Sequence, residues 1–132
     1  LVVDPVMVST SGVALLDEVG IDCLKARLLP MASLVTPNIP EAERLSGRNI
    51  GNLEDMGAAA ADILATGVGA VLIKGGHLPG EVVRDLLVWP GGRLQSVSRI
   101  PLPGSKEKNR ERQWAFLVRV TLALLLPTSL PQ

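Results

Sequence analysis

Three short stretches of the sequence carry side chains that could bind a cation or a phosphate. Each follows an apolar run, and together they contain Asp4, the turn Thr36-Pro37-Asn38 with Glu41, and Lys74-Gly75-Gly76. Two carboxylates and an amide oxygen suit a hard cation such as Mg²⁺, which prefers oxygen ligands and keeps several waters. A lysine beside two glycines could meet nucleotide phosphates as a point charge, because glycine lets the backbone come close. The combination indicates phosphoryl transfer.

Each of these residues also has a purely structural interpretation. Asn38 and Glu41 stand at the N-cap and N3 spacing of a capping box, worth about 1 kcal/mol, and spacing alone favours that cap over a metal site. Asp4 could simply end a strand at a turn with Pro5, and Lys74-Gly75-Gly76 could be a solvated loop.

Three further residues have weaker claims to chemistry. A single histidine such as His77 more often belongs to a polar loop than to a catalytic site. Asp85 could be a charge at a sheet edge. Cys23 falls on an apolar helical stripe, which favours a place in the core over a role as nucleophile.

The surrounding pattern predicts an α/β fold. Short apolar runs at Leu1–Val3, Ser33–Thr36 and Ala70–Ile73 read as strands, and "VVRDLLVW" with "RLQSVSRI" reads as a hairpin around Pro90-Gly91-Gly92. Helices are expected over Val13–Leu29, from Pro40 to Gly47, and from Asn52 to Gly67, the first with Leu16, Val19, Cys23 and Leu24 on its buried stripe. This order indicates right-handed crossovers and a mainly parallel sheet, whose strand ends meet at one crevice.

Composition narrows the possible partners and compartments. The 132 residues carry 13 basic and 13 acidic side chains, a balance that argues against a nucleic-acid partner. The single cysteine allows no internal disulfide and suits a reducing, cytoplasmic setting. The apolar run Ala115–Leu126 is too short for a span of about 20 residues, so no membrane partner is expected. The start "LVVDPVMV" has neither an initiator Met nor a signal peptide, and we interpret the chain as a fragment.

Four motifs in order resemble the C-terminal half of the hydroxymethylpyrimidine/phosphomethylpyrimidine kinase family. They are "VVDPVMVSTSG", "RLLPMASLVTPNIPEAERLSG", "GAVLIKGGHLPGEVVRDLL" and the strand pair that follows. "DPVM" and "TPN" also occur in the related pyridoxal kinases, whereas "RLLP" and "KGGHL" favour the pyrimidine kinases. The resemblance implies a ribokinase-like three-layer αβα fold, present here as a partial domain over residues 1–103, with a divergent tail over residues 104–132.

The resemblance also implies an activity and a set of binding residues. The family transfers the γ-phosphate of ATP to 4-amino-5-hydroxymethyl-2-methylpyrimidine and then to its monophosphate, in thiamine biosynthesis. Asn38 and Glu41 match an Asn-x-x-Glu element that organises Mg²⁺ and its waters, and Asp4 and Thr36 match polar positions beside it. Lys74, next to Gly75 and Gly76, matches a lysine that approaches the ATP phosphates.

The sequence departs from the family in one segment that matters for catalysis. Where the family has a Gly-Thr-Gly-Cys turn that forms an anion hole, this chain reads "IPLPGSKEKNRERQWAF". Losing such a site could cost about 3 to 4 kcal/mol of transition-state stabilisation per donor. We therefore assign no catalytic residue, and keep as alternatives a non-catalytic Mg-ATP-binding or interaction module and a pyridoxal-kinase relative. The first strand is expected to leave an apolar edge that favours aggregation or pairing, including a homo-oligomer.

Overall fold

The computed structural model describes residues 1–9, 11–76 and 82–99, with the backbone alone at 82 and 94–99. Residues Leu1–Arg99 form one compact unit. His77 and the tail over residues 104–132 lie outside the described residues, as does the predicted boundary at residue 103.

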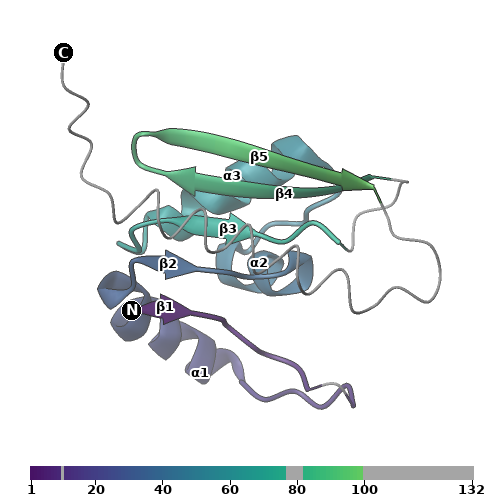
Figure 1. Cartoon of the computed structure of the whole chain (residues 1–132). Helices are drawn as coiled ribbons and strands as arrows, with labels where there is room; N and C mark the ends of the chain where they lie inside the picture. Colours follow the sequence, from purple (N-terminus) through teal and green to yellow (C-terminus); the bar gives the residue numbers. More distant parts are fainter. Residues whose placement is uncertain (10, 77–81, 100–132) are drawn as a thin grey trace. The chain divides into compact units, whose positions relative to one another are not determined.

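A five-stranded sheet forms the centre of this unit (Figure 1). Its strands, in spatial order, are β1 (Val2–Val3), β2 (Leu34–Val35), β3 (Val71–Ile73), β4 (Val82–Trp89) and β5 (Gly92–Arg99). β1, β2 and β3 pair in parallel, and β4 and β5 continue the sheet as an antiparallel hairpin. The predicted α/β fold and the hairpin around Pro90 and Gly91 are confirmed.

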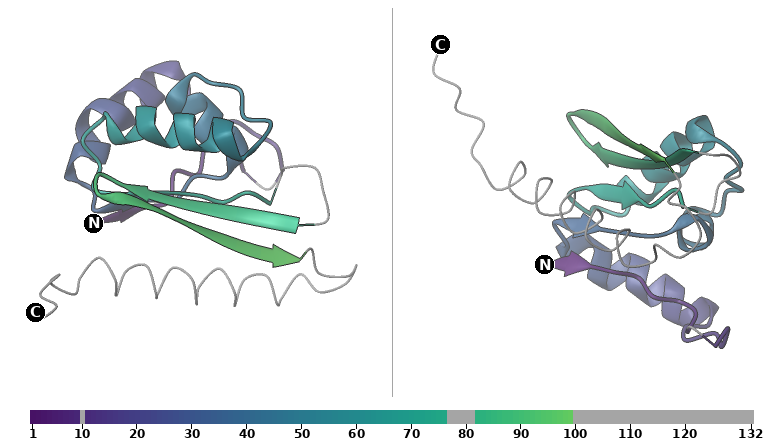
Figure 2. Two further views of the ribbon diagram at one scale, coloured as in Figure 1. Left: turned by 90° about the horizontal axis from the view of Figure 1, so that it is seen from above. Right: turned by 45° about the vertical axis from the view of Figure 1, so that its right-hand side comes forward.

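Three α-helices cover one face of the sheet (Figure 2). They are α1 (Glu18–Cys23), α2 (Ile39–Ser46) and α3 (Leu53–Leu64). The core between the two layers holds Val35 and Val71 from the strands and Ala42, Met56 and Ala60 from the helices, none of them exposed. The described residues thus contain the sheet and one helical layer of the predicted three-layer arrangement.

Helices α2 and α3 begin where their capping residues predict, and α2 also ends as predicted, whereas α3 ends at Leu64 with Ala65 as its C-cap, before the predicted end at Gly67. Asn38 caps α2, and Gly47 follows that helix in the left-handed conformation at φ 72°. The Asn52 side chain accepts a hydrogen bond from the Asp55 N–H at 2.9 Å, which caps α3. These caps use contacts within a few residues, so the sequence alone was enough to place both helices.

The prediction for the first helix was partly wrong. The segment over Val13–Leu15 is not helical: Leu15 N–H donates to Met7 O, and the helix begins only after Asp17, whose side chain accepts from the Gly20 N–H. After Cys23 the chain continues as a π-helical turn over Leu24–Leu28 and a 3₁₀ turn over Leu29–Met31.

The predicted buried stripe of this helix was half right: Leu16 and Leu24 pack against the core, but Val19 and Cys23 do not. Ile21 is 2% exposed and faces the core, whereas Val19 is 76% exposed. Cys23 is exposed as well, which contradicts its expected place in the core. Each residue of an α-helix turns by about 100°, so Val19 and Cys23 both lie roughly opposite Ile21. When Ile21 faces the core, Val19 and Cys23 therefore face away from it. In the described part of the chain no helix is long and apolar enough to cross a membrane.

Candidate functional site

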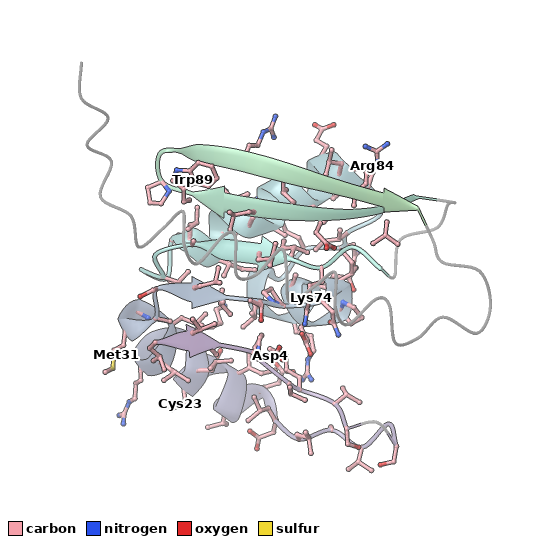
Figure 3. The ribbon with its side chains drawn as sticks, in the orientation of Figure 1. Asp4, Cys23, Met31, Lys74, Arg84 and Trp89 are labelled. Atoms are coloured by element: carbon pink, nitrogen blue, oxygen red, sulfur yellow. The ribbon has the colours of Figure 1, made fainter. Side chains whose placement is uncertain are left out.

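The carboxyl ends of the three parallel strands bring the predicted site residues together. Lys74, just after β3, donates its backbone N–H to Pro37 O at 2.9 Å and pairs with Asn38 as an isolated bridge. Its Nζ lies 3.6 Å from Asp4 Oδ1, just after β1. Figure 3 shows Asp4 and Lys74 at the same end of the sheet. Parallel neighbours end at the same edge, which is why residues 70 positions apart in sequence meet here.

The Asn38–Glu41 pair forms a complete capping box at the start of α2. Asn38 Oδ1 accepts from the Glu41 N–H at 2.9 Å, and Glu41 Oε2 accepts from the Asn38 N–H at 2.8 Å. The structural interpretation of this pair is therefore confirmed. It leaves room for a second role, because the cap directs both side chains to the positive end of the helix.

Glu41 carries a buried carboxyl whose pKa depends on the other charges of the site. Glu41 is only 8% exposed. Burial raises the pKa of Glu41, while the Asn38 N–H and the positive charge of Lys74 oppose that rise and the negative charge of Asp4 adds to it. Glu41, Lys74 and Asp4 thus lie close enough to influence one another electrostatically.

The turn Lys74-Gly75-Gly76 is held from the neighbouring strand β4. The Gly75 N–H donates to Asp85 Oδ1 at 2.9 Å. A Cβ added at Gly75 would lie 1.8 Å from Arg84 O, so no other residue fits at this position without a backbone shift. Gly75 is buried, which rules out a simple solvated loop at this position.

Thr36 directly follows β2, at the strand ends that carry this cluster. The residue is 4% exposed, and its backbone N–H donates to Val3 O at 3.0 Å, which joins the ends of β1 and β2. Thr36 thus holds these strand ends together, and a nucleotide contact of Thr36 stays a prediction.

The donor set of the cluster fits a hydrated Mg²⁺ better than a closed protein cage. No group of three or more His, Cys, Asp or Glu side chains among the described residues is arranged to hold a metal ion. Asp4, with 59% of its side chain exposed, offers a carboxylate, whereas one Glu41 oxygen is engaged in the cap. Mg²⁺ usually keeps several waters and takes one or two carboxylates, which matches this set.

Asp85 is the residue that the sequence did not assign to the site. It lies on β4, which has neighbours on both sides, so the interpretation as a sheet-edge charge was wrong. The feature of the sequence that could have pointed to Asp85 is a charged residue inside the predicted strand "VVRDLLVW". The register that pairs Ile73 with Leu86 places Asp85 beside Lys74, and only that register reveals its contact with the turn.

Comparisons with known proteins show which family this chain resembles. The family model described as phosphomethylpyrimidine kinase matches residues 1–106. The thiamine biosynthesis bifunctional protein ThiED of Geobacter sulfurreducens is 55% identical over 87 residues, which cover 66% of this chain and 18% of that protein. The hydroxymethylpyrimidine/phosphomethylpyrimidine kinase of Aquifex aeolicus is 47% identical over 87 residues, which cover 66% of this chain and 34% of that protein. The chain thus spans about a third or less of the length of these two relatives.

Solved kinase structures share the fold. Pyridoxal kinase from Staphylococcus aureus in complex with AMP-PCP superposes with a TM-score of 0.69 at 35% identity, covering 78% of this chain and 38% of that one. Phosphomethylpyrimidine kinase from Clostridium difficile 630 gives a TM-score of 0.65 at 34% identity, covering 92% of this chain and 56% of that one. These neighbours are ribokinase-like kinases, so the predicted fold is confirmed. With the family pattern matched over residues 1–106, this chain belongs to the phosphomethylpyrimidine kinase family.

Proposed function

We propose that this chain carries the Mg-ATP-binding part of a kinase that phosphorylates 4-amino-5-hydroxymethyl-2-methylpyrimidine and its monophosphate in thiamine biosynthesis. The observation that carries the proposal is the convergence of Asp4, Glu41 and Lys74 at the carboxyl edge of β1, β2 and β3. Family membership supports the substrate class, and related kinases bound to ADP and AMP-PCP support the nucleotide.

Each residue of the cluster has a defined part in binding. The Lys74 ammonium, on a side chain 23% exposed, would bind phosphate oxygens as a point charge and exchange its contact with Asp4 for the nucleotide. Asp4 and Glu41 would hold Mg²⁺ through its waters, and Asn38 keeps Glu41 in place through the cap. Bound Mg²⁺ neutralises charge on the phosphates. The N-terminus of α2 adds favourable backbone N–H groups nearby.

Binding, rather than turnover, is the proposed property of this exact chain. The family's anion-hole turn has no counterpart in "IPLPGSKEKNRERQWAF". Phosphoryl transfer depends almost entirely on positioning and electrostatic stabilisation, so a chain without that turn would be a poor catalyst. A non-catalytic Mg-ATP-binding module is therefore the second candidate, because it too would bind Mg-ATP without turnover.

Isothermal titration with Mg-ATP, run beside a kinase assay on the pyrimidine, tests the proposal. We expect binding by the 132-residue chain, and binding weaker by about tenfold or more for Lys74→Ala, because a charge-assisted phosphate contact is lost. Lys25→Ala, on the turn after α1, is the matched control and should bind like the unmodified chain. Binding without turnover is the result expected for this chain, whereas turnover contradicts the importance of the missing anion hole. No binding at all contradicts the proposal.

A pyridoxal kinase is the alternative that the solved structures favour, because the Staphylococcus aureus enzyme superposes with a TM-score of 0.69. Side-by-side assays with pyridoxal and the pyrimidine distinguish the two substrates. Phosphorylation or binding of pyridoxal alone would replace the pyrimidine in the proposal.

We place the protein in the cytoplasm, since a lone exposed cysteine suits a reducing compartment. Cell fractionation followed by immunodetection tests this placement, and recovery from an oxidising compartment would contradict it.

A further inference from the structure

We propose that Asp85 is a positioning residue of the phosphate-binding turn: its carboxylate holds Gly75 so that Lys74 and Gly76 are presented to the nucleotide. This inference rests on the proposed function and deepens it, because it divides the turn into two parts. Lys74 and Gly76 bind phosphate, and Gly75 is held by β4.

The register of the hairpin puts Asp85 where it can do this. β3 and β4 pair as far as Ile73 and Leu86, and the next residues along are Lys74 and Asp85. From there, Gly75 N–H donates to the Asp85 carboxylate at 2.9 Å. Where the backbone pairing of β3 ends, the Asp85 side chain thus supplies the next hydrogen bond to β4. This bond fixes the direction in which the turn leaves the sheet.

The same contact assigns different functions to the two glycines. The Gly75 N–H is already used by Asp85, and the backbone of Arg84 fills the space beside Gly75. Gly76 is exposed, and no described atom lies within 4 Å of a Cβ added there. Among the described residues nothing fills the space where a phosphate would approach Gly76, whereas Gly75 permits the close packing that Asp85 secures.

Its hydrogen bond makes Asp85 a fixed element, whereas its exposure makes Asp4 an exchangeable one. Burial raises the pKa of Asp85, while the Gly75 N–H and the charge of Lys74 oppose that rise. Asp4 has 59% of its side chain exposed, and its contact with Lys74 spans 3.6 Å. An incoming phosphate would replace Asp4 beside Lys74 more readily than it would displace the hydrogen-bonded Asp85.

Two substitutions at Asp85 and one matched control test this role. Asp85→Ala removes the acceptor, whereas Asp85→Asn keeps an oxygen that can accept from Gly75. The control is Asp55→Ala, because the Asp55 carboxylate also accepts from a glycine N–H, that of Gly51, at 2.9 Å. Should Asp85→Ala fail to fold, Asp85→Val removes the acceptor with a side chain that favours strands.

The measurements are Mg-ATP affinity by calorimetry and hydrogen exchange of the Gly75 amide by NMR, both on the 132-residue chain. We expect Asp85→Ala to weaken Mg-ATP binding by about tenfold and to speed Gly75 exchange, since a hydrogen bond to a charged group is lost. Asp85→Asn should restore binding to within about threefold of the unmodified chain, because a neutral acceptor keeps much of the bond. Asp55→Ala should leave both measurements at the Asp85 site unchanged.

The outcomes separate this inference from the proposed function. Asp85→Ala that binds Mg-ATP as well as the unmodified chain overturns the positioning role. Equal Gly75 exchange in the Ala and Asn variants overturns it too. An unmodified chain that binds no Mg-ATP, with Gly75 still protected by Asp85, contradicts the proposed function and leaves the contact as a structural one.

Discussion

Two strand-to-helix connections among the described residues occupy equivalent places in the fold but are built differently. After β2, the chain enters α2 within Thr36–Asn38, and the capping box closes the connection at once. After β1, the chain takes residues 4–17 to reach α1, passing through an isolated bridge between Val8 and Ala14. Both connections leave the sheet at the same edge, yet only the one after β2 is short.

The difference extends to where the apolar side chains lie. In α2, Ile39 is 5% exposed and Leu45 is 1% exposed, so the helix buries these apolar side chains in the core. In the first connection, Val13 is 61% exposed and Leu15 is 54% exposed. The Asn38–Glu41 half of the site is thus supported by its own local packing. Asp4 begins a segment that places Met7 in the core, at 0% exposed, but leaves four apolar side chains largely exposed: Val6, Val8, Val13 and Leu15.

The largest expected difference concerns packing. Leu45→Ala should lower the free energy of unfolding by about 3 kcal/mol, because it empties a fully packed position in α2. Leu15→Ala, the same change in the first connection, should lower it by less than about 1 kcal/mol, since much of that side chain already meets water. Urea unfolding followed by circular dichroism measures both values. Equal losses would show that the first connection is packed as tightly as the second.

The next effect concerns the edge of the sheet. Within the described residues β1 pairs with β2 alone, and Leu1 and Val2 are 60% and 53% exposed. We expect the chain to self-associate through this edge, as predicted from the sequence, and Val2→Lys to weaken association by about tenfold, because edge lysines oppose strand pairing. Light scattering over a concentration series measures this. Arg27→Lys is a control without a change of charge, and a monomeric unmodified chain would contradict the prediction.

The caps give a smaller difference. Asn38→Ala should cost about 1 to 2 kcal/mol of stability, because it breaks the capping box of α2. Asp17→Ala should cost about 0.5 to 1 kcal/mol, because α1 has an exposed cap and only six residues. Denaturant unfolding measures both, and Asn38→Asp is the control that keeps an acceptor. A larger loss for Asp17→Ala would reverse the comparison.

Local signals explain which parts of the fold could be predicted. Asn38, Gly47 and Asn52 mark helix ends through contacts three or four residues away, so α2 and α3 follow from the sequence. The phase of α1 depends on which side chain reaches the core. Ile21 does so, and Val19 does not, a choice that depends on long-range packing and not on the periodic pattern.

The candidate site divides in the same way. Asp4, Asn38 and Lys74 were expected together because the ends of parallel strands share an edge, and the structure brings them together. Asp85 was not placed there, because its contact with Gly75 depends on the antiparallel register of β3 and β4. A strand pattern in the sequence gives the faces of a strand, but the register with its neighbour comes only from the fold.

The smallest expected effect is a pH dependence that comes from Asp85. Burial raises its pKa in the folded state above the ordinary value of 3.8, so the folded chain binds more protons than the unfolded chain just above that pH. The free energy of unfolding therefore falls as pH rises from below 3.8 through the folded-state pKa, since the buried carboxyl must ionise. Asp85→Asn should remove this part of the decrease, whereas the exposed Asp22→Asn should keep it. Urea unfolding at a series of pH values measures the difference, and an unchanged pH dependence in Asp85→Asn would mean that Asp85 is hydrated as fully as a surface carboxylate.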